Sequence, residues 1–97
     1  MTTKQLLREK RMDINRIAAK HGAHNVRVFG SIARNEDTEQ SDVDLLIDVE
    51  AASISPWFPA GLVVELEDLL GRKVDVLTEQ ALHPLIREQV LREAVSF

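Results

Sequence analysis

The chain has 97 residues, of which 44% are hydrophobic and 29% charged, and it contains no cysteine. This composition is that of one folded globular domain over residues 1–97, and it excludes a disordered chain, a disulfide scaffold and a thiolate zinc site. The net charge of -4 argues against direct nucleic-acid binding. No apolar run reaches the roughly 20 residues that cross a membrane. The lack of cysteine fits a cytoplasmic protein.

The amino-terminal part is predicted to form one helix and one short strand. Thr2 or Thr3 can cap a helix that runs until Gly22, a helix-ending residue. This helix is basic, which fits a solvated face better than a surface for an acidic partner. Residues 26–29 follow as a strand, and after a turn of helix the acidic stretch 35–41 is expected to be a solvated loop.

The clearest strand covers residues 43–49. Its odd positions are all aliphatic, and its even positions carry aspartates, because side chains alternate between the two faces of a strand. Asp42, Asp44 and Asp48 therefore share one face. Asp48 lies about 6.5–7 Å beyond Asp44 along the strand, so we expect a polar strand-end residue there rather than a ligand.

Two more helices and a third strand are predicted in the second half. Ser55-Pro56 signals the start of a helix that ends at Gly71, residues 73–77 form the strand, and Pro84 opens the last helix. The apolar side chains of this last helix are expected to face inward: Leu85, Ile86, Val90 and Leu91. The fold class is therefore α+β, with a small mixed sheet of three to four strands and helices packed on one face.

Three carboxylates are candidates for a metal site. Asp42 and Asp44, two positions apart on a strand, point the same way and repel each other. A divalent cation with a preference for oxygen ligands, Mg²⁺ or Mn²⁺, removes that conflict. Asp75 faces the same side if its valine neighbours face the helices. Three such carboxylates could hold two ions about 3.5–4 Å apart, the arrangement used for in-line phosphoryl or nucleotidyl transfer.

Gly30 and Ser31 are candidates for phosphate binding. A glycine lets the backbone approach phosphate oxygens closely, and a helix that begins at Ser31 would offer free N–H groups and a hydroxyl donor. Arg34, one turn further on, could neutralise a terminal phosphate. Each of these features is common by itself; the combination with the three aspartates is specific.

These residues carry a resemblance. Residues 28–34 (VFGSIAR) and 41–47 (SDVDLLI) resemble the signature of the polymerase-beta-type nucleotidyltransferase superfamily. Nearly the whole chain, with the segment 73–77 and the tail 86–95, is similar to minimal nucleotidyltransferase (MNT) domain proteins, so we expect it to be complete. One departure is Asn35, where the family commonly has glycine. Asparagine tolerates a left-handed backbone, so we expect the turn to survive.

The resemblance implies a site and a partner. Asp42 and Asp44 would bind two Mg²⁺ ions, and Asp75 would complete the site and help activate the attacking hydroxyl. Gly30 and Ser31 would hold the β- and γ-phosphates of ATP. Such proteins are commonly antitoxins, in a hetero-oligomer with a HEPN-domain ribonuclease toxin, and they transfer AMP from ATP to a tyrosine hydroxyl of that toxin.

The small size of the chain bears on the acceptor independently. Once the sheet and helices are assigned, little chain remains to grip an acceptor, which favours a protein that brings its own binding surface. Two alternatives remain: a non-catalytic antitoxin that neutralises its partner by binding, and a small-molecule nucleotidyltransferase of the aminoglycoside type. Trp57 and Phe58 either fill the core or form a partner-binding edge. The histidines, without metal-ligand spacing, are expected in capping or surface roles: His21, His24 and His83.

Overall fold

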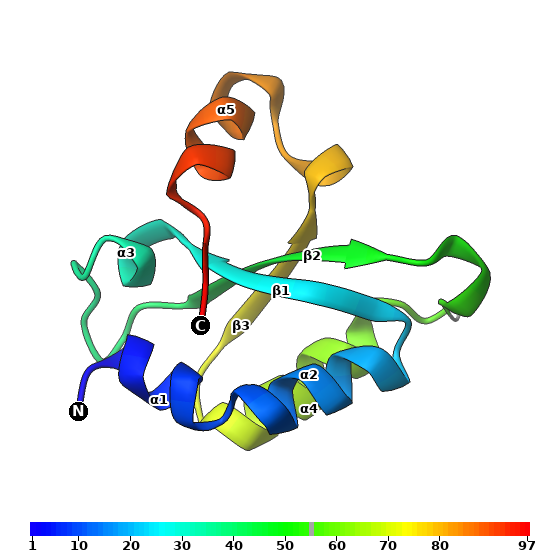
Figure 1. The fold of residues 1–97 in the computed structure, drawn as a ribbon, viewed down its shortest axis with the longest axis horizontal. Coiled ribbons are helices and arrows are strands. Elements are labelled where there is room, and N and C mark those ends of the chain that lie inside the picture. Colours follow the sequence, from blue (N-terminus) through cyan, green and yellow to red (C-terminus); the bar gives the residue numbers. More distant parts are fainter. Residues whose placement is uncertain (55) are drawn as a thin grey trace.

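The computed structural model describes residues 1–54 and 56–97, which form a four-stranded mixed sheet with helices (Figure 1). The strand order is β3-β2-β1-β4. β1 pairs antiparallel with β2 and β4, whereas β2 and β3 are parallel. The predicted α+β class is confirmed. The strands are β1 (Ala23–Phe29), β2 (Val43–Val49), β3 (Val74–Thr78) and β4 (Val95–Ser96).

Three helices lie together on one side of the sheet (Figure 1), as the sequence predicted. They are α1 (Thr3–Glu9), α2 (Arg11–Lys20) and α4 (Ala60–Leu70). Their apolar side chains bury the aliphatic face of the central strands, and each fully buried Leu or Ile contributes about 1.5–3 kcal/mol through the removal of apolar surface from water. We call this cluster the main core; its completely or almost completely buried residues include Leu7, Ile14, Val28, Val43, Leu45, Ile47, Leu62 and Leu66.

The opposite face of the sheet carries a smaller apolar cluster under α5 (Pro84–Glu93), which stands on the other side from α1, α2 and α4 (Figure 1). The cluster consists of Phe29, Leu46, Leu82 and Val90. Val90 is the buried residue of α5, while Leu85 is 87% exposed. The prediction that Leu85, Ile86 and Leu91 face inward was therefore wrong. The α5 sequence has the apolar periodicity of a helix, but the face of the sheet under α5 offers only a small apolar surface for it to cover.

Several boundaries differ from those predicted. The first helix begins with Thr2 in a capping box with Gln5, and it breaks at Lys10 into α1 and α2. The helix predicted at Pro56 begins only at Ala60, because the residue before a proline disfavours the helical conformation and Pro59 stands in the way. Ser55, the other half of that signal, lies outside the described residues. β4 was not predicted, since two residues show no periodicity.

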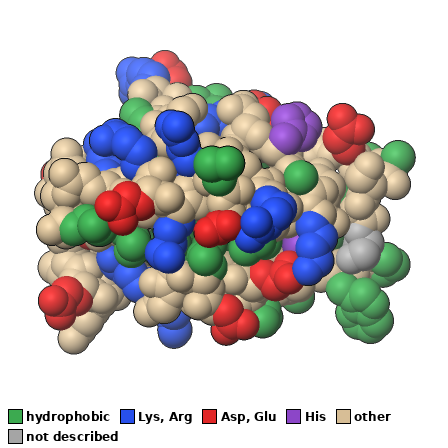
Figure 2. All heavy atoms as spheres, turned by 60° about the horizontal axis from the view of Figure 1, so that its bottom comes forward, with side chains coloured by type: hydrophobic (Ala, Val, Ile, Leu, Met, Phe, Trp, Pro, Cys, Tyr) green, Lys and Arg blue, Asp and Glu red, His purple; other side chains and the backbone are tan. Residues whose placement is uncertain are grey.

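The outer surface of α1, α2 and α4 carries both basic and acidic side chains. Figure 2 shows Lys and Arg side chains interspersed with Asp and Glu over it. Arg16 pairs with Asp13 at 2.7 Å and Lys20 with Glu65 at 2.5 Å, which fits the interpretation of the basic helix as a solvated face. Within the described part of the chain, each helix is too short or too polar to cross a membrane.

Short elements complete the chain and position the site. The single-turn helix α3 (Gly30–Ala33) follows β1 directly, and its residue Ile32 is buried in the main core. Two 3-10 turns, η1 (Ala51–Ser53) and η2 (Glu79–Ala81), end β2 and β3 respectively. The end of β1, the start of β2 and the start of β3 thus meet beside α3.

Candidate functional site

Asp44 lies at the centre of the acidic site. The parallel register pairs it with Asp75 on β3, and the antiparallel register pairs it with Phe29, the residue before Gly30. Its neighbours Val43 and Leu45 are fully buried in the main core, so Asp44 points to the opposite face. The same alternation about buried Val74 and Val76 places Asp75 on that face, as predicted from the sequence.

The environment of Asp44 disfavours a negative charge. Burial, followed by the charges of the nearby Asp75 and Asp42 carboxylates, raises the pKa of this half-buried carboxyl to about 6, although the Arg34 guanidinium acts in the opposite direction. A carboxyl with such a pKa titrates close to neutral pH. Charge repulsion among these three aspartates is therefore a property of the fold, and a bound cation would relieve it.

The three aspartates fit a divalent cation by donor type. Carboxylate oxygens on two adjacent strands are the hard ligands that Mg²⁺ and Mn²⁺ prefer. Asp42 and Asp75 are exposed and Asp44 is partly buried. Among the described residues, no three acidic or histidine side chains come close enough together to enclose an ion. The structure therefore brings Asp44 and Asp75 into register without forming a closed coordination shell.

Gly30 lies directly against Asp44. Its φ of +74° is in the left-handed region, and a Cβ built on it would stand 2.4 Å from Asp44 Oδ2. Only glycine fits both the backbone and the space at this position. Asn35, just after α3, has a φ of 58°, so the expectation that this asparagine adopts a left-handed backbone is confirmed.

Arg34 is engaged by two carboxylates. Its Nε donates to Glu36 Oε2 at 3.0 Å, and its Nη1 donates to both oxygens of Glu93, at 3.0 and 3.2 Å. Glu36 and Glu93 raise the pKa of this guanidinium. Arg34 was expected to neutralise a terminal phosphate; in this structure two carboxylates of the protein are its anionic partners.

Glu93, at the end of α5, was missed from the sequence. Its Oε1 also accepts a hydrogen bond from the backbone N–H of Gly30 at 2.8 Å. The sequence did contain a signal, because a carboxylate in the last turn of a helix interacts unfavourably with the helix dipole and such a residue often has a binding partner elsewhere. In this structure the partner of Glu93 is the Gly30 turn, which borders Asp44.

Arg72 is a second residue that the sequence analysis missed. Its guanidinium donates to the backbone carbonyls of Thr38 and Ser41, at 2.9 and 2.5 Å, and to Thr3 Oγ1 at 2.7 Å. Asp37, expected to be solvated, is partly buried here and accepts from Thr3 at 2.6 Å. Arg72 thereby holds the loop that leads into Asp42, just before β2.

The remaining candidates lie outside the site. Asp48 accepts from Arg27 at 2.8 Å and from Asn25 at 2.9 Å, which fits the prediction of a polar strand-end residue. His83 caps α5 through Nδ1, and His21 contacts Glu65. Of the two aromatic residues before α4, Trp57 is 80% exposed while Phe58 packs partly against the main core.

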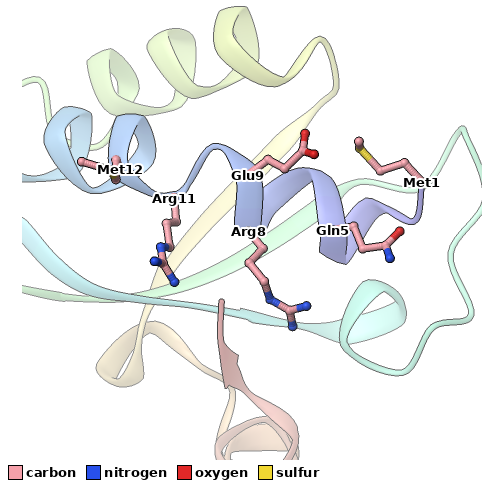
Figure 3. Close-up of a pocket in the computed structure, with 6 residues that line it drawn as sticks. All are labelled: Met1, Gln5, Arg8, Glu9, Arg11 and Met12. Atoms are coloured by element: carbon pink, nitrogen blue, oxygen red, sulfur yellow. The ribbon is translucent and has the colours of Figure 1, made fainter.

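A surface hollow of about 610 Å³ lies elsewhere, along α1 and the start of α2 (Figure 3). Its polar lining includes Arg8 and Arg11, whose side chains point to the same side in Figure 3. None of the three aspartates lines it, nor does Gly30. The candidate chemistry therefore sits on the same face of the sheet as α5 and not in this hollow.

Comparison with known proteins identifies a family for this chain. The Nucleotidyltransferase domain family matches residues 12–96. A Methanocaldococcus jannaschii protein named "Putative protein adenylyltransferase MJ0435" is 45% identical over 80 residues, which cover 81% of this chain and 84% of that protein. "Protein adenylyltransferase MntA" of Thermococcus cleftensis is 41% identical over 76 residues, covering 78% of this chain and 76% of that protein.

Solved structures share the fold. One described as "Structure of putative minimal nucleotidyltransferase" has a TM-score of 0.83 and 45% sequence identity, with 100% of this chain and 97% of that chain covered. A second, "Crystal structure of the toxin-antitoxin with AMP-PNP", has a TM-score of 0.68 at 19% identity and covers 89% of this chain and 68% of that chain, a likeness of fold. The chain therefore belongs to the nucleotidyltransferase domain family, in its minimal form, and is a nucleotidyltransferase.

Proposed function

We propose that this protein transfers AMP from ATP to a hydroxyl group of a partner protein, in a reaction that requires Mg²⁺. The observation that carries the proposal is the pairing of Asp44 with Asp75 across parallel strands, directly beside the left-handed Gly30. Relatives named protein adenylyltransferases, 41% and 45% identical, support a protein as the acceptor.

The aspartates would hold the metal and the turn would hold the nucleotide. Asp42, Asp44 and Asp75 would bind two Mg²⁺ ions, with Mn²⁺ as a substitute. The bound ions would supply charge neutralisation to the triphosphate and would polarise the α-phosphate. Gly30 and Ser31 would bind the β- and γ-phosphates, since the glycine lets phosphate oxygens approach the backbone and the serine adds a hydroxyl donor.

The transfer is an in-line displacement at the α-phosphorus. The acceptor hydroxyl oxygen forms a bond to that phosphorus and gives its proton to the Asp75 carboxylate. The bond from the phosphorus to the bridging oxygen breaks, and pyrophosphate leaves with the electron pair. Asp75 is exposed at this face, so it is placed to meet an acceptor that arrives from solution.

The partner we propose is a HEPN-type ribonuclease toxin, modified on a tyrosine, with this chain as the antitoxin in a hetero-oligomer. The fold shared with a toxin–antitoxin structure supports a toxin as the partner. The small size of the chain supports it too, because residues 1–97 act in our proposal as one catalytic domain that borrows its acceptor surface. The reaction would take place in the cytoplasm.

The test is incubation of the neighbouring gene product with this protein, ATP and Mg²⁺, followed by the intact mass of that product. We expect a gain of one or more AMP units, which EDTA abolishes. Asp42→Asn/Asp44→Asn should show no gain. The matched control is Asp68→Asn, an exposed acid on α4 remote from the site, which should act like the wild type.

The alternatives give different results in the same experiment. If the double variant still protects cells from the partner and the wild type adds no mass, neutralisation occurs by binding alone and the proposal is wrong. If the wild type modifies an aminoglycoside in the absence of any protein partner, the acceptor class is wrong while nucleotidyl transfer stands.

A further inference from the structure

The carboxylate of Glu93 joins the carboxyl end of the chain to the turn beside Asp44. Its Oε1 accepts from the Gly30 backbone N–H at 2.8 Å, and both of its oxygens accept from Arg34 Nη1, at 3.0 and 3.2 Å. One side chain thus contacts both ends of α3. Hydrogen bonds between charged groups are stronger and more directional than neutral ones.

Glu93 is itself fixed from both sides along the chain. Three residues earlier, Val90 is 6% exposed in the second apolar cluster. Two residues later the backbone enters β4, where Val95 and Ser96 pair with β1. The Glu93 side chain is only 17% exposed. A carboxylate anchored in this way is suited to hold other groups in place.

The groups that it holds are those that define the site. The Gly30 N–H belongs to the peptide between Phe29 and Gly30, and Phe29 is the register partner of Asp44. Gly30 also approaches Asp44 too closely for any Cβ. A rotation of this peptide would therefore change the contact with Asp44 and move the start of α3 together with Ser31.

We propose that Glu93 is a positioning residue of the nucleotide site, which sets the orientation of the Gly30 turn and of Arg34. This role rests on the proposed function, because it assumes that the turn receives the triphosphate of ATP. The active site is then formed by two segments that are distant in the sequence: the glycine turn after β1 and the last turn of α5.

Glu93 could instead act as an internal anion that ATP must displace, and removal of its charge would then strengthen ATP binding. A displaced carboxylate would have to leave Gly30 and Arg34, although the chain is anchored at Val90 and at β4. The anchoring favours a fixed support. Removal of the charge should consequently weaken ATP binding and not strengthen it.

The experiment compares Glu93→Gln with the wild type. Glutamine keeps the shape, and its amide oxygen can still accept from Gly30 and Arg34, but it carries no negative charge and its NH2 group cannot replace the second acceptor for Arg34 Nη1. We expect the KM for ATP to rise by on the order of tenfold, the range for groups that orient a binding residue, with kcat near the wild-type value. A purely structural role would reduce the folded fraction and hence the apparent kcat, leaving KM unchanged.

Glu88→Gln is the matched control, since Glu88 is 87% exposed on the same helix and lies 3.9 Å from Arg92. It should leave both constants unchanged. Arg34→Gln removes the same ion pair from the other side, and we expect the double variant Glu93→Gln/Arg34→Gln to be no worse than the more impaired of the two single variants. Arg34→Gln also tests the role should Glu93→Gln fail to fold.

A second readout needs no turnover. In the nucleotide-free protein, the Gly30 amide proton should resonate downfield because it donates to a carboxylate, and it should move upfield in Glu93→Gln and stay in place in Glu88→Gln. An unchanged Gly30 amide, or ATP binding in Glu93→Gln as tight as in the wild type, would overturn the role of Glu93 and leave the proposed function standing. Absence of MgATP binding by the wild type would overturn the proposed function, and the role with it.

Discussion

Asp44 on β2 is the register partner of Asp75 on the parallel strand β3, so two carboxylates share the face of the sheet on which α5 lies. This pairing brings together two residues 31 positions apart in the sequence, each between two aliphatic residues that are buried on the other face. Burial and the neighbouring acids raise the pKa of Asp44 to about 6. The carboxylates of this site therefore repel one another, and a bound cation would reduce that repulsion.

The raised pKa of Asp44 predicts that the stability of the metal-free protein depends on pH. The folded-state pKa of Asp44 is raised above the ordinary value of 3.8, so its contribution to stability is fully present below pH 4 and is lost as the pH rises through about 6. Asp44→Asn, which cannot ionise, should gain in Tm relative to the wild type over this window. Thermal melts in EDTA from pH 4 to 7.5 measure the difference.

Asp48→Asn is the control of opposite sign on the same strand face. A hydrogen bond from Asn25 and the charge of Arg27 lower the pKa of Asp48, so its contribution is present above the ordinary pKa and lost as the pH falls through the lowered one. This variant should be less stable than the wild type near pH 7 and should approach it in strong acid. A Tm difference for Asp44→Asn that does not change with pH would contradict the prediction.

A pair of glycine substitutions separates backbone strain from site geometry. Gly30 and Gly71 both have positive φ, +74° and +66°, but a Cβ on Gly71 meets nothing within 4 Å, whereas a Cβ on Gly30 meets Asp44. Alanine should cost each position about 1–2 kcal/mol of unfolding free energy. Only Gly30→Ala should abolish AMP transfer, because the Asp44 carboxylate must turn away.

Urea denaturation and the mass assay measure the two effects separately. If Gly71→Ala lost activity to the same degree as Gly30→Ala at equal stability, contact with Asp44 would not be the cause.

Arg72 is predicted to be irreplaceable by lysine. Its guanidinium bonds two carbonyls and a hydroxyl at once and is mostly buried, with 16% of the side chain exposed. Lysine has no planar fork and would leave at least one carbonyl unpaired, at a cost of about 1–3 kcal/mol. Arg72→Lys should lower the unfolding free energy and reduce activity through the loop before Asp42.

The control for this change is Arg16→Lys, since the Arg16 side chain is 76% exposed in its pair with Asp13. Pairs of this kind contribute little, so stability should be almost unchanged. Equal effects of the two substitutions would show that the fork of Arg72 has no special role.

Trp57 offers an optical test of the fold. It is the single tryptophan of the sequence and is 80% exposed, just before α4. Acrylamide should quench its fluorescence almost as efficiently in the native protein as in urea, because the quencher reaches the ring in both states. Strong protection in the isolated native protein would contradict this placement, while protection that arises only with the partner would favour a partner-binding edge.

The sequence by itself determined the parts that depend on local periodicity and local backbone chemistry. Alternation of aliphatic and polar residues fixed the faces of β2 and β3, and with them the common side of Asp44 and Asp75. Gly22, Gly71 and Asn35 marked positions of positive φ correctly, since a left-handed backbone excludes most other residues.

Only the tertiary structure decided which distant groups meet. Glu93 reaches the N–H of Gly30 across 63 positions, and Arg72 reaches Ser41 across 31. Neither contact leaves a periodic trace, because it depends on where a helix end or a loop is placed by packing elsewhere. The apolar stripe of α5 showed the same limit: its period was visible in the sequence, but the narrow second face of the sheet decided that Val90 is buried while Leu85 is exposed.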